Sequence, residues 1–94
     1  MPAGVTNRAE SGEAVQATAL QALAWTVAEP ERAERLLALT GLDPASLRAR
    51  AGEPAVLAAA LSFLEANERD LVACADAIAT TPAALVAARE ALER

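Results

Sequence analysis

The side chains that could do chemistry in this chain are carboxylates, arginines and a single thiol. His, Lys and Tyr are absent from its 94 residues, and Cys74 is the only Cys. Without His there is no imidazole to serve Cys74 as a base, to complete a serine triad or to help bind zinc. Cys74 lies between Ala73 and Ala75, near Asp76, so we expect a small residue of the core or its boundary and not a nucleophile.

Two pairs of carboxylates are candidates for acid–base chemistry, Glu31 with Glu34 and Asp70 with Asp76. Paired acids can hydrolyse glycosides, but they need a cleft and side chains that hold the substrate. Beyond the first ten residues the chain has one Asn and two Gln for that purpose. Solvated helix faces explain the acids better. We therefore predict that the protein is not an enzyme and has no catalytic residue, no cofactor and no metal site.

Four residues are candidate contacts with a partner: Trp25, Arg48, Arg50 and Phe63. The two aromatic rings either line a groove for an amphipathic partner helix or fill an alanine-rich core. The two arginines either meet a carboxylate of a partner or stay solvated near a helix C-terminus, where cations are favoured. Both alternatives remain open for each pair at the level of sequence.

The charge balance restricts the class of partner. Eight Arg against thirteen Asp and Glu give a formal charge of −5 and a pI near 4.6, which opposes binding to DNA phosphates and to anionic membranes. No apolar run reaches the length of a membrane span, and the first ten residues lack the pattern of a signal peptide. We expect a cytoplasmic protein that binds no membrane, whose partner is another protein or a second copy of itself (a homodimer).

Prolines and an excess of alanine predict the secondary structure. Ala occupies 27 positions, and Ala and Leu favour helix throughout. Four prolines each follow an oxygen-bearing side chain, as at the first turn of a helix: Glu29-Pro30, Asp43-Pro44, Glu53-Pro54 and Thr81-Pro82. Gly41 and Gly52 precede two of these starts and fit the left-handed residue that ends a helix.

These signals predict an all-α fold, a compact bundle of five to six short helices. Residues 1–10 have no apolar period and are expected to form a flexible tail, with residues 11–94 as one helical domain. The predicted helices cover about 11–28, 30–40, 44–51, 54–66, 68–79 and 82–93.

Apolar residues recur in each predicted helix at steps of three and four residues, which indicates one buried face. The residues expected to face the core are Val15, Ala19, Ala22, Leu23, Thr26, Val27, Leu36, Leu37, Leu39, Leu47, Val56, Leu57, Ala60, Leu61, Leu64, Leu71, Val72, Ala75, Ile78, Leu85, Val86, Ala88 and Leu92.

The two halves of the chain resemble each other. A shift of 38 positions places Leu23 on Leu61, Trp25 on Phe63, Ala28 on Ala66, Pro44 on Pro82 and Leu47 on Leu85. The matching caps, turns and aromatic residues favour a pseudo-repeat of two three-helix halves. The alternative is two ordinary helical hairpins that have converged.

The segment 30–51 has the pattern of a helix-turn-helix, with a glycine turn and arginines on the second helix. Leu37, however, stands where the helix crossing normally needs a small residue, and only Arg48 and Arg50 are available to contact DNA. A structural corner of this shape is the preferred interpretation. A DNA-binding regulator is the alternative.

One stretch resembles a known family. The turn Leu39-Thr40-Gly41-Leu42-Asp43-Pro44, followed by Leu47-Arg48 and by Ala60-Leu61-Ser62-Phe63-Leu64, is similar to domain of unknown function 3572, a family of short helical proteins from alphaproteobacteria. The resemblance covers roughly residues 14–92. Where the family commonly has an Ile-Asp-Pro turn in the second half, this chain has Thr80-Thr81-Pro82. The resemblance implies no activity, cofactor or site residue.

Together these observations favour a non-catalytic interaction or adaptor domain that acts through a helical surface. The alternative is the DNA-binding regulator that uses segment 30–51.

Overall fold

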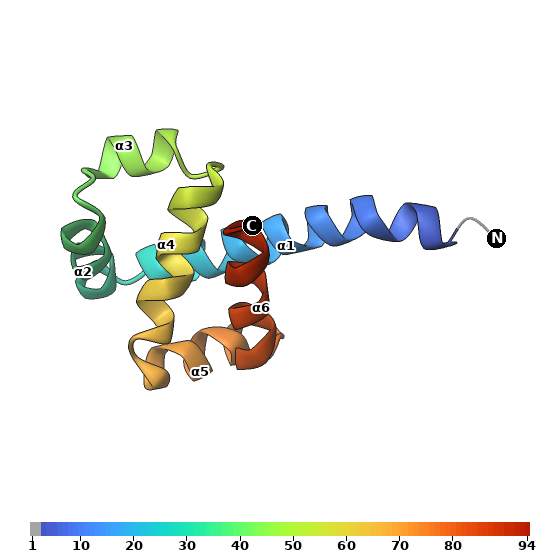
Figure 1. Cartoon of the computed structure of the whole chain (residues 1–94). Helices are drawn as coiled ribbons and strands as arrows, with labels where there is room; N and C mark the ends of the chain where they lie inside the picture. The colour runs from blue at the N-terminus through green and yellow to red at the C-terminus, as the bar shows by residue number, and fades with distance from the viewer. Residues whose placement is uncertain (1–2) are drawn as a thin grey trace.

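The computed structural model describes residues 3–94, with side chains from residue 12 onward. This part of the chain is built from helices without a strand, which confirms the all-α prediction (Figure 1). The six helices are α1 (Ala3–Val27), α2 (Pro30–Thr40), α3 (Pro44–Ala49), α4 (Pro54–Glu65), α5 (Glu68–Ala77) and α6 (Pro82–Leu92).

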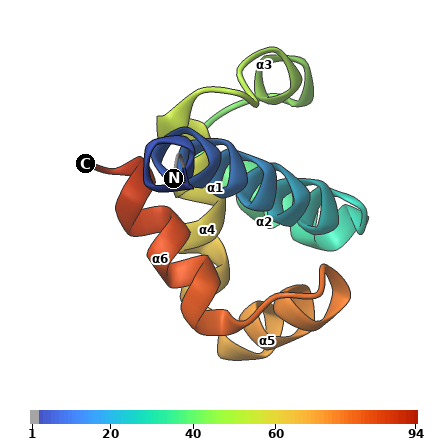
Figure 2. The ribbon, with the colours of Figure 1, turned by 90° about the vertical axis from the view of Figure 1, so that its right-hand side faces the viewer.

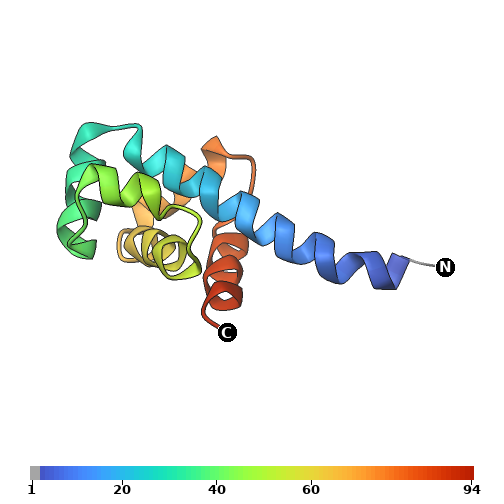
Figure 3. The same ribbon diagram turned by 90° about the horizontal axis from the view of Figure 1, so that it is seen from above.

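The start of α1 differs from the prediction. The helix begins at Ala3 instead of near Ser11, so residues 3–10, predicted as a tail, continue α1. The absence of an apolar period was a poor guide there, because helix propensity does not need a buried face and no proline interrupts α1 between Ala3 and Val27. The N-terminal part of α1 projects beyond the other helices (Figures 1 and 3). The expected flexibility of residues 1–10 stays a prediction.

The other helices begin where the prolines and caps predicted. The side chains of Asp43 and Thr81 accept hydrogen bonds from the backbone N–H groups of Ser46 and Ala84, at 2.7 and 3.1 Å. The bond from Ser46 holds the pKa of Asp43 below its ordinary value, because it favours the charged carboxylate. Glu53, a poor cap by type, makes no such bond.

Two helix ends use a left-handed residue, and they lie 38 positions apart. Gly41 has φ of 76° and Ala79 has φ of 60°. Gly52, which was predicted to be left-handed, is not among the residues with positive φ, so this prediction is wrong. The turn after α3 is closed by a hydrogen bond from the Glu53 N–H to the Arg50 carbonyl.

Helix α4 lies at the centre of the molecule. Helices α1, α2, α5 and α6 pack against it, and α1 also packs against α6, as the view along α1 shows (Figure 2). By contrast, α3 packs extensively against no other helix and stands apart at one side (Figures 1 and 2). Side chains at 2% exposure or less include Leu36, Leu57, Leu61, Leu64, Leu85, Thr26 and Cys74.

Three residues predicted to face the core are exposed: Val27 by 37%, Leu39 by 62% and Val72 by 49%. Leu39 lies in the last turn of α2, where no other helix covers it closely, and Val72 is one step around α5 from the buried Leu71. A short helix packed on one side buries a narrower stripe than its sequence period suggests.

One ion pair joins the two halves of the chain, and another joins two helices of the second half. Arg35 of α2 lies 3.4 Å from Asp70 of α5, and Arg89 of α6 pairs with Glu65 of α4. No described helix is by itself long and apolar enough to cross a membrane, and α5 and α6 pass that test only as a pair that bends by 98°.

Candidate functional site

The two predicted aromatic residues lie in different environments. Phe63 is 8% exposed and forms part of the core, with the Arg35 guanidinium 5.4 Å from its ring centroid. Trp25 is half-buried against the core. Both rings therefore pack mainly against the protein itself.

Arg32 covers Trp25. Its guanidinium carbon lies 3.8 Å from the ring centroid, and its Nη2 donates a 2.9 Å hydrogen bond to the Trp25 carbonyl. A third contact, at 3.7 Å, joins Arg32 to Glu29. These contacts fix the corner between α1 and α2, so this feature is structural.

The two predicted arginines of α3 also differ. Arg50 forms a 3.0 Å ion pair with Glu53. Arg48 is exposed and forms no ion pair within the part of the chain that the structure describes. Among the four predicted contacts, Arg48 is therefore the one that presents an uncompensated charge.

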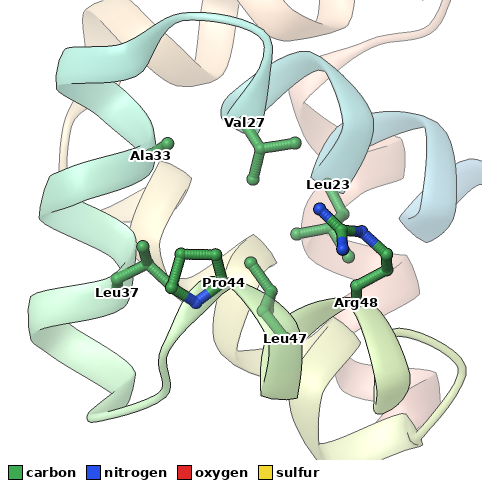
Figure 4. A pocket seen from close by; sticks show the side chains of 7 residues that line it. All are labelled: Leu23, Val27, Ala33, Leu37, Pro44, Leu47 and Arg48. Carbon is green, nitrogen blue, oxygen red and sulfur yellow. The ribbon is translucent and has the colours of Figure 1, made fainter.

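Arg48 lines a pocket of about 350 Å³ between α1, α2 and α3. We call it the α1–α2–α3 groove. Figure 4 shows side chains from the three helices facing this common space, with the Arg48 guanidinium on the α1 side. Apart from Arg48 its lining is apolar: Leu23, Val27, Ala33, Leu37, Pro44 and Leu47.

The second half of the molecule shows why this groove is open. The shift of 38 positions matches α3 to the first part of α6, but α6 has 11 residues and α3 has six. The longer α6 packs on α1, α4 and α5. Because the chain turns into α4 soon after Ala49, α3 is too short to pack in the same way.

The side chains at matched positions differ in size and in charge. Ala33, on the α2 wall of the groove, corresponds to the larger and buried Leu71. Val27 corresponds to Glu65, whose carboxylate pairs with Arg89. This pairing raises the pKa of Arg89, because the hydrogen bond favours the charged guanidinium. The second half is thus closed by its own side chains, whereas the first half leaves apolar surface and one cation in water.

Among the residues that the structure describes, no three Cys, Asp or Glu side chains are grouped as metal ligands. Cys74 is buried, as predicted, and burial raises the pKa of its thiol to about 11. The groove can bind apolar side chains and one anionic group, and it offers no general base.

Of the groove residues, only Arg48 was predicted as a contact with a partner. Leu23, Val27, Leu37 and Leu47 were predicted to face the core: Leu23 and Leu47 are buried, which confirms the prediction, whereas Leu37 is half-buried and Val27 is exposed. The sequence contained one sign that α2 and α3 do not pack closely: Leu37 is too large for the helix crossing of a helix-turn-helix.

The comparisons with known proteins agree with the resemblance of the Thr-Gly-Leu-Asp-Pro turn. No curated protein and no solved structure matches the chain significantly. A family model described as "Protein of unknown function (DUF3572)" matches residues 12–94. The match covers α2 to α6 and α1 from its third turn onward. The chain therefore belongs to the DUF3572 family.

Proposed function

We propose that this protein is a non-catalytic interaction domain, a cytoplasmic adaptor that holds a segment of another protein in the α1–α2–α3 groove. The observation that carries the proposal is the combination of an open apolar groove with a cation at its edge that has no partner in the described residues. Apolar surface of this kind is costly to leave in water, and on a folded protein it commonly marks a binding site.

The rest of the molecule supports a role in recognition. The net charge of −5 opposes binding to nucleic acid and favours a protein partner. The groove is framed by helices whose ends are fixed by the caps at Glu29 and Asp43 and by the left-handed Gly41. A surface preformed in this way loses little conformational entropy on binding.

Site-specific photocrosslinking in cells of the source organism tests the proposal. A photoreactive phenylalanine replaces Val27 in the groove, and the matched control replaces Val72, an exposed valine on α5 outside the groove. We expect the label at position 27 to crosslink one protein and the label at position 72 not to do so. We also expect Arg48→Glu to weaken the crosslink at position 27.

Three outcomes would contradict the proposal. Equal crosslinking from both positions would show that the groove is not selective. No protein crosslink at position 27 would remove the groove as a docking site. A DNA fragment bound tightly at about 50 mM salt and released steeply as the salt rises would favour the DNA-binding alternative instead.

A further inference from the structure

We infer that the α1–α2–α3 groove takes an amphipathic α-helix of a partner protein, and that a carboxylate on this helix pairs with Arg48. The inference rests on the proposed function and names the chemistry of the partner. Two observations support it: Arg48 at the edge of the groove has no carboxylate beside it among the described residues, and the residue types that line the groove suit a helix better than a strand or a proline-rich segment.

The first support is the charge at the edge of the groove. Arg48 is exposed beside an apolar lining and forms no ion pair with the described residues, whereas Arg50 pairs with Glu53. The ion pair of the second half has no counterpart here, because Glu65 and Arg89 match Val27 and Ala51. A bound segment that carries a carboxylate would therefore supply the anion that Arg48 lacks.

The second support is the form of the groove. Addition of a β-strand needs a free sheet edge, and the described residues contain no strand. Proline-rich segments dock on aromatic grooves, whereas none of the lining residues of this groove is aromatic. A groove between helices that is lined by Leu, Val, Ala and Pro fits the apolar face of a helix, with anchors spaced three or four residues apart.

Arg48 then has a defined role in selection. Apolar anchors alone discriminate poorly among amphipathic helices, since many sequences offer them. A partly covered ion pair with Arg48 would favour a helix with an acidic residue at one edge of its apolar face and would disfavour a basic residue there. Arg50 has no such role, because Glu53 already neutralises it.

Helical peptides are the probe for this inference. Each has about 15 residues, is stapled to hold the helix and carries leucines at helical spacing. Glu is placed in turn at each position that borders the leucine face, and every Glu peptide has a twin with Gln. Binding is followed by the NMR shifts of the backbone amides of Leu23, Val27, Leu37 and Leu47, with the amide of Val72 as a reference outside the groove.

We expect one Glu peptide to shift the groove amides and to bind about fivefold more tightly than its Gln twin, the effect of one partly covered ion pair. This preference should disappear in Arg48→Met and persist in Arg50→Met. A third variant, Val27→Glu, restores the carboxylate that the second half has at the matched position. It should keep the fold and lose the Glu preference, whereas Val27→Gln should retain it.

Other results would overturn the inference. These are equal binding of the Glu and Gln twins, binding only of unstapled proline-containing peptides, or no shift of groove amides at about 1 mM peptide. If the NMR shifts of the groove amides change with protein concentration in the absence of peptide, the groove binds a second copy of the chain. If the crosslink at position 27 persists in cells while all helical peptides fail, the inference falls and the proposed function stands. If both fail, both fall.

Discussion

At the scale of single residues, Arg32 makes three contacts at the corner between α1 and α2. It contacts the Trp25 ring, the Trp25 carbonyl and Glu29, while its Nε is buried without a hydrogen-bond partner in the described structure. A planar guanidinium can stack and donate at the same time, which a lysine could not do. Arg32 therefore stabilises the corner between α1 and α2, which supports one end of the groove.

Arg32→Met should lower the free energy of unfolding by about 1–3 kcal/mol, because it removes a cation–π contact and a hydrogen bond to a carbonyl. The matched control is Arg69→Met, since Arg69 is exposed and forms no ion pair within the described residues. It should change the free energy by less than about 0.5 kcal/mol. Urea unfolding followed by the fluorescence of the only Trp measures both, and equal losses would contradict the role of Arg32.

Cys74 should make stability depend on pH in the alkaline range. Burial raises the pKa of its thiol from 9.0 to about 11 in the folded chain, and the nearby positive charge of Arg32 opposes this only in part. Between these pH values the unfolded chain loses the proton and the folded chain keeps it, so stability falls as pH rises from 9 to 11 and levels off above that. The full loss amounts to about 3 kcal/mol.

The chain offers an unusually clean test of this pH dependence. It has no Lys, Tyr or His, so Cys74 is the only side chain that titrates between pH 8 and 11. Urea unfolding at a series of pH values should show the decline in the wild type, and Cys74→Ala should remove the slope whatever its stability at neutral pH. The same decline in both proteins would show that another group is responsible.

At the scale of helices, the sequence located the starts of five helices and left the strain in one turn undetected. Gly41 and Ala79 occupy matched left-handed turns with φ of 76° and 60°. Glycine adopts this conformation without cost, whereas the Cβ of alanine makes it unfavourable by about 1 kcal/mol. The pseudo-repeat is therefore present in backbone conformation even where the residue type is not.

Substitutions at these two turns should change the free energy of unfolding in opposite directions. Gly41→Ala should lower the free energy of unfolding by about 1 kcal/mol, and Ala79→Gly should raise it by a similar amount. A Cβ at position 41 or 52 would meet no atom within 4 Å, so crowding does not contribute. Gly52→Ala is the control and should change stability by less than about 0.5 kcal/mol, since Gly52 is not left-handed. Thermal unfolding measures all three, and a loss of stability in Ala79→Gly would contradict the assignment.

At the scale of the whole molecule, the two halves are not separate units. Helix α1 of the first half packs on α4, α5 and α6 of the second, and the buried residues of both halves form one cluster. Among the side chains that the structure describes, those of α1 in or against this cluster lie between Val15 and Trp25. Stability therefore depends on this part of α1 and on both halves together.

Deletion of residues 1–11 should leave cooperative unfolding intact and change the free energy by less than about 0.5 kcal/mol. A fragment of residues 50–94 keeps α4, α5 and α6 but lacks α1, so it should lose cooperative unfolding because the apolar faces that α1 covers become exposed. Circular dichroism during heating compares the two proteins with the full chain. A fragment that unfolds cooperatively would show that the halves are independent.

The sequence by itself determined the fold class, the starts of five helices and the interval between the two halves. These features depend on local causes that a sequence displays directly: prolines at first turns, caps such as Asp43 and Thr81, and the helix propensity of alanine. The burial of Leu36 and Leu61 also followed from their helical period.

Only the tertiary structure decided that α6 closes on α1 and α4 while α3 stands apart. It also decided that Val27 is exposed on the wall of the α1–α2–α3 groove, that Leu37 lines the groove and packs only partly against the core, and that Arg48, unlike Arg50, has no ion pair within the described residues. The physical reason is that an apolar period states which face of a helix avoids water, whereas burial depends on which other helix is long enough and close enough to cover it.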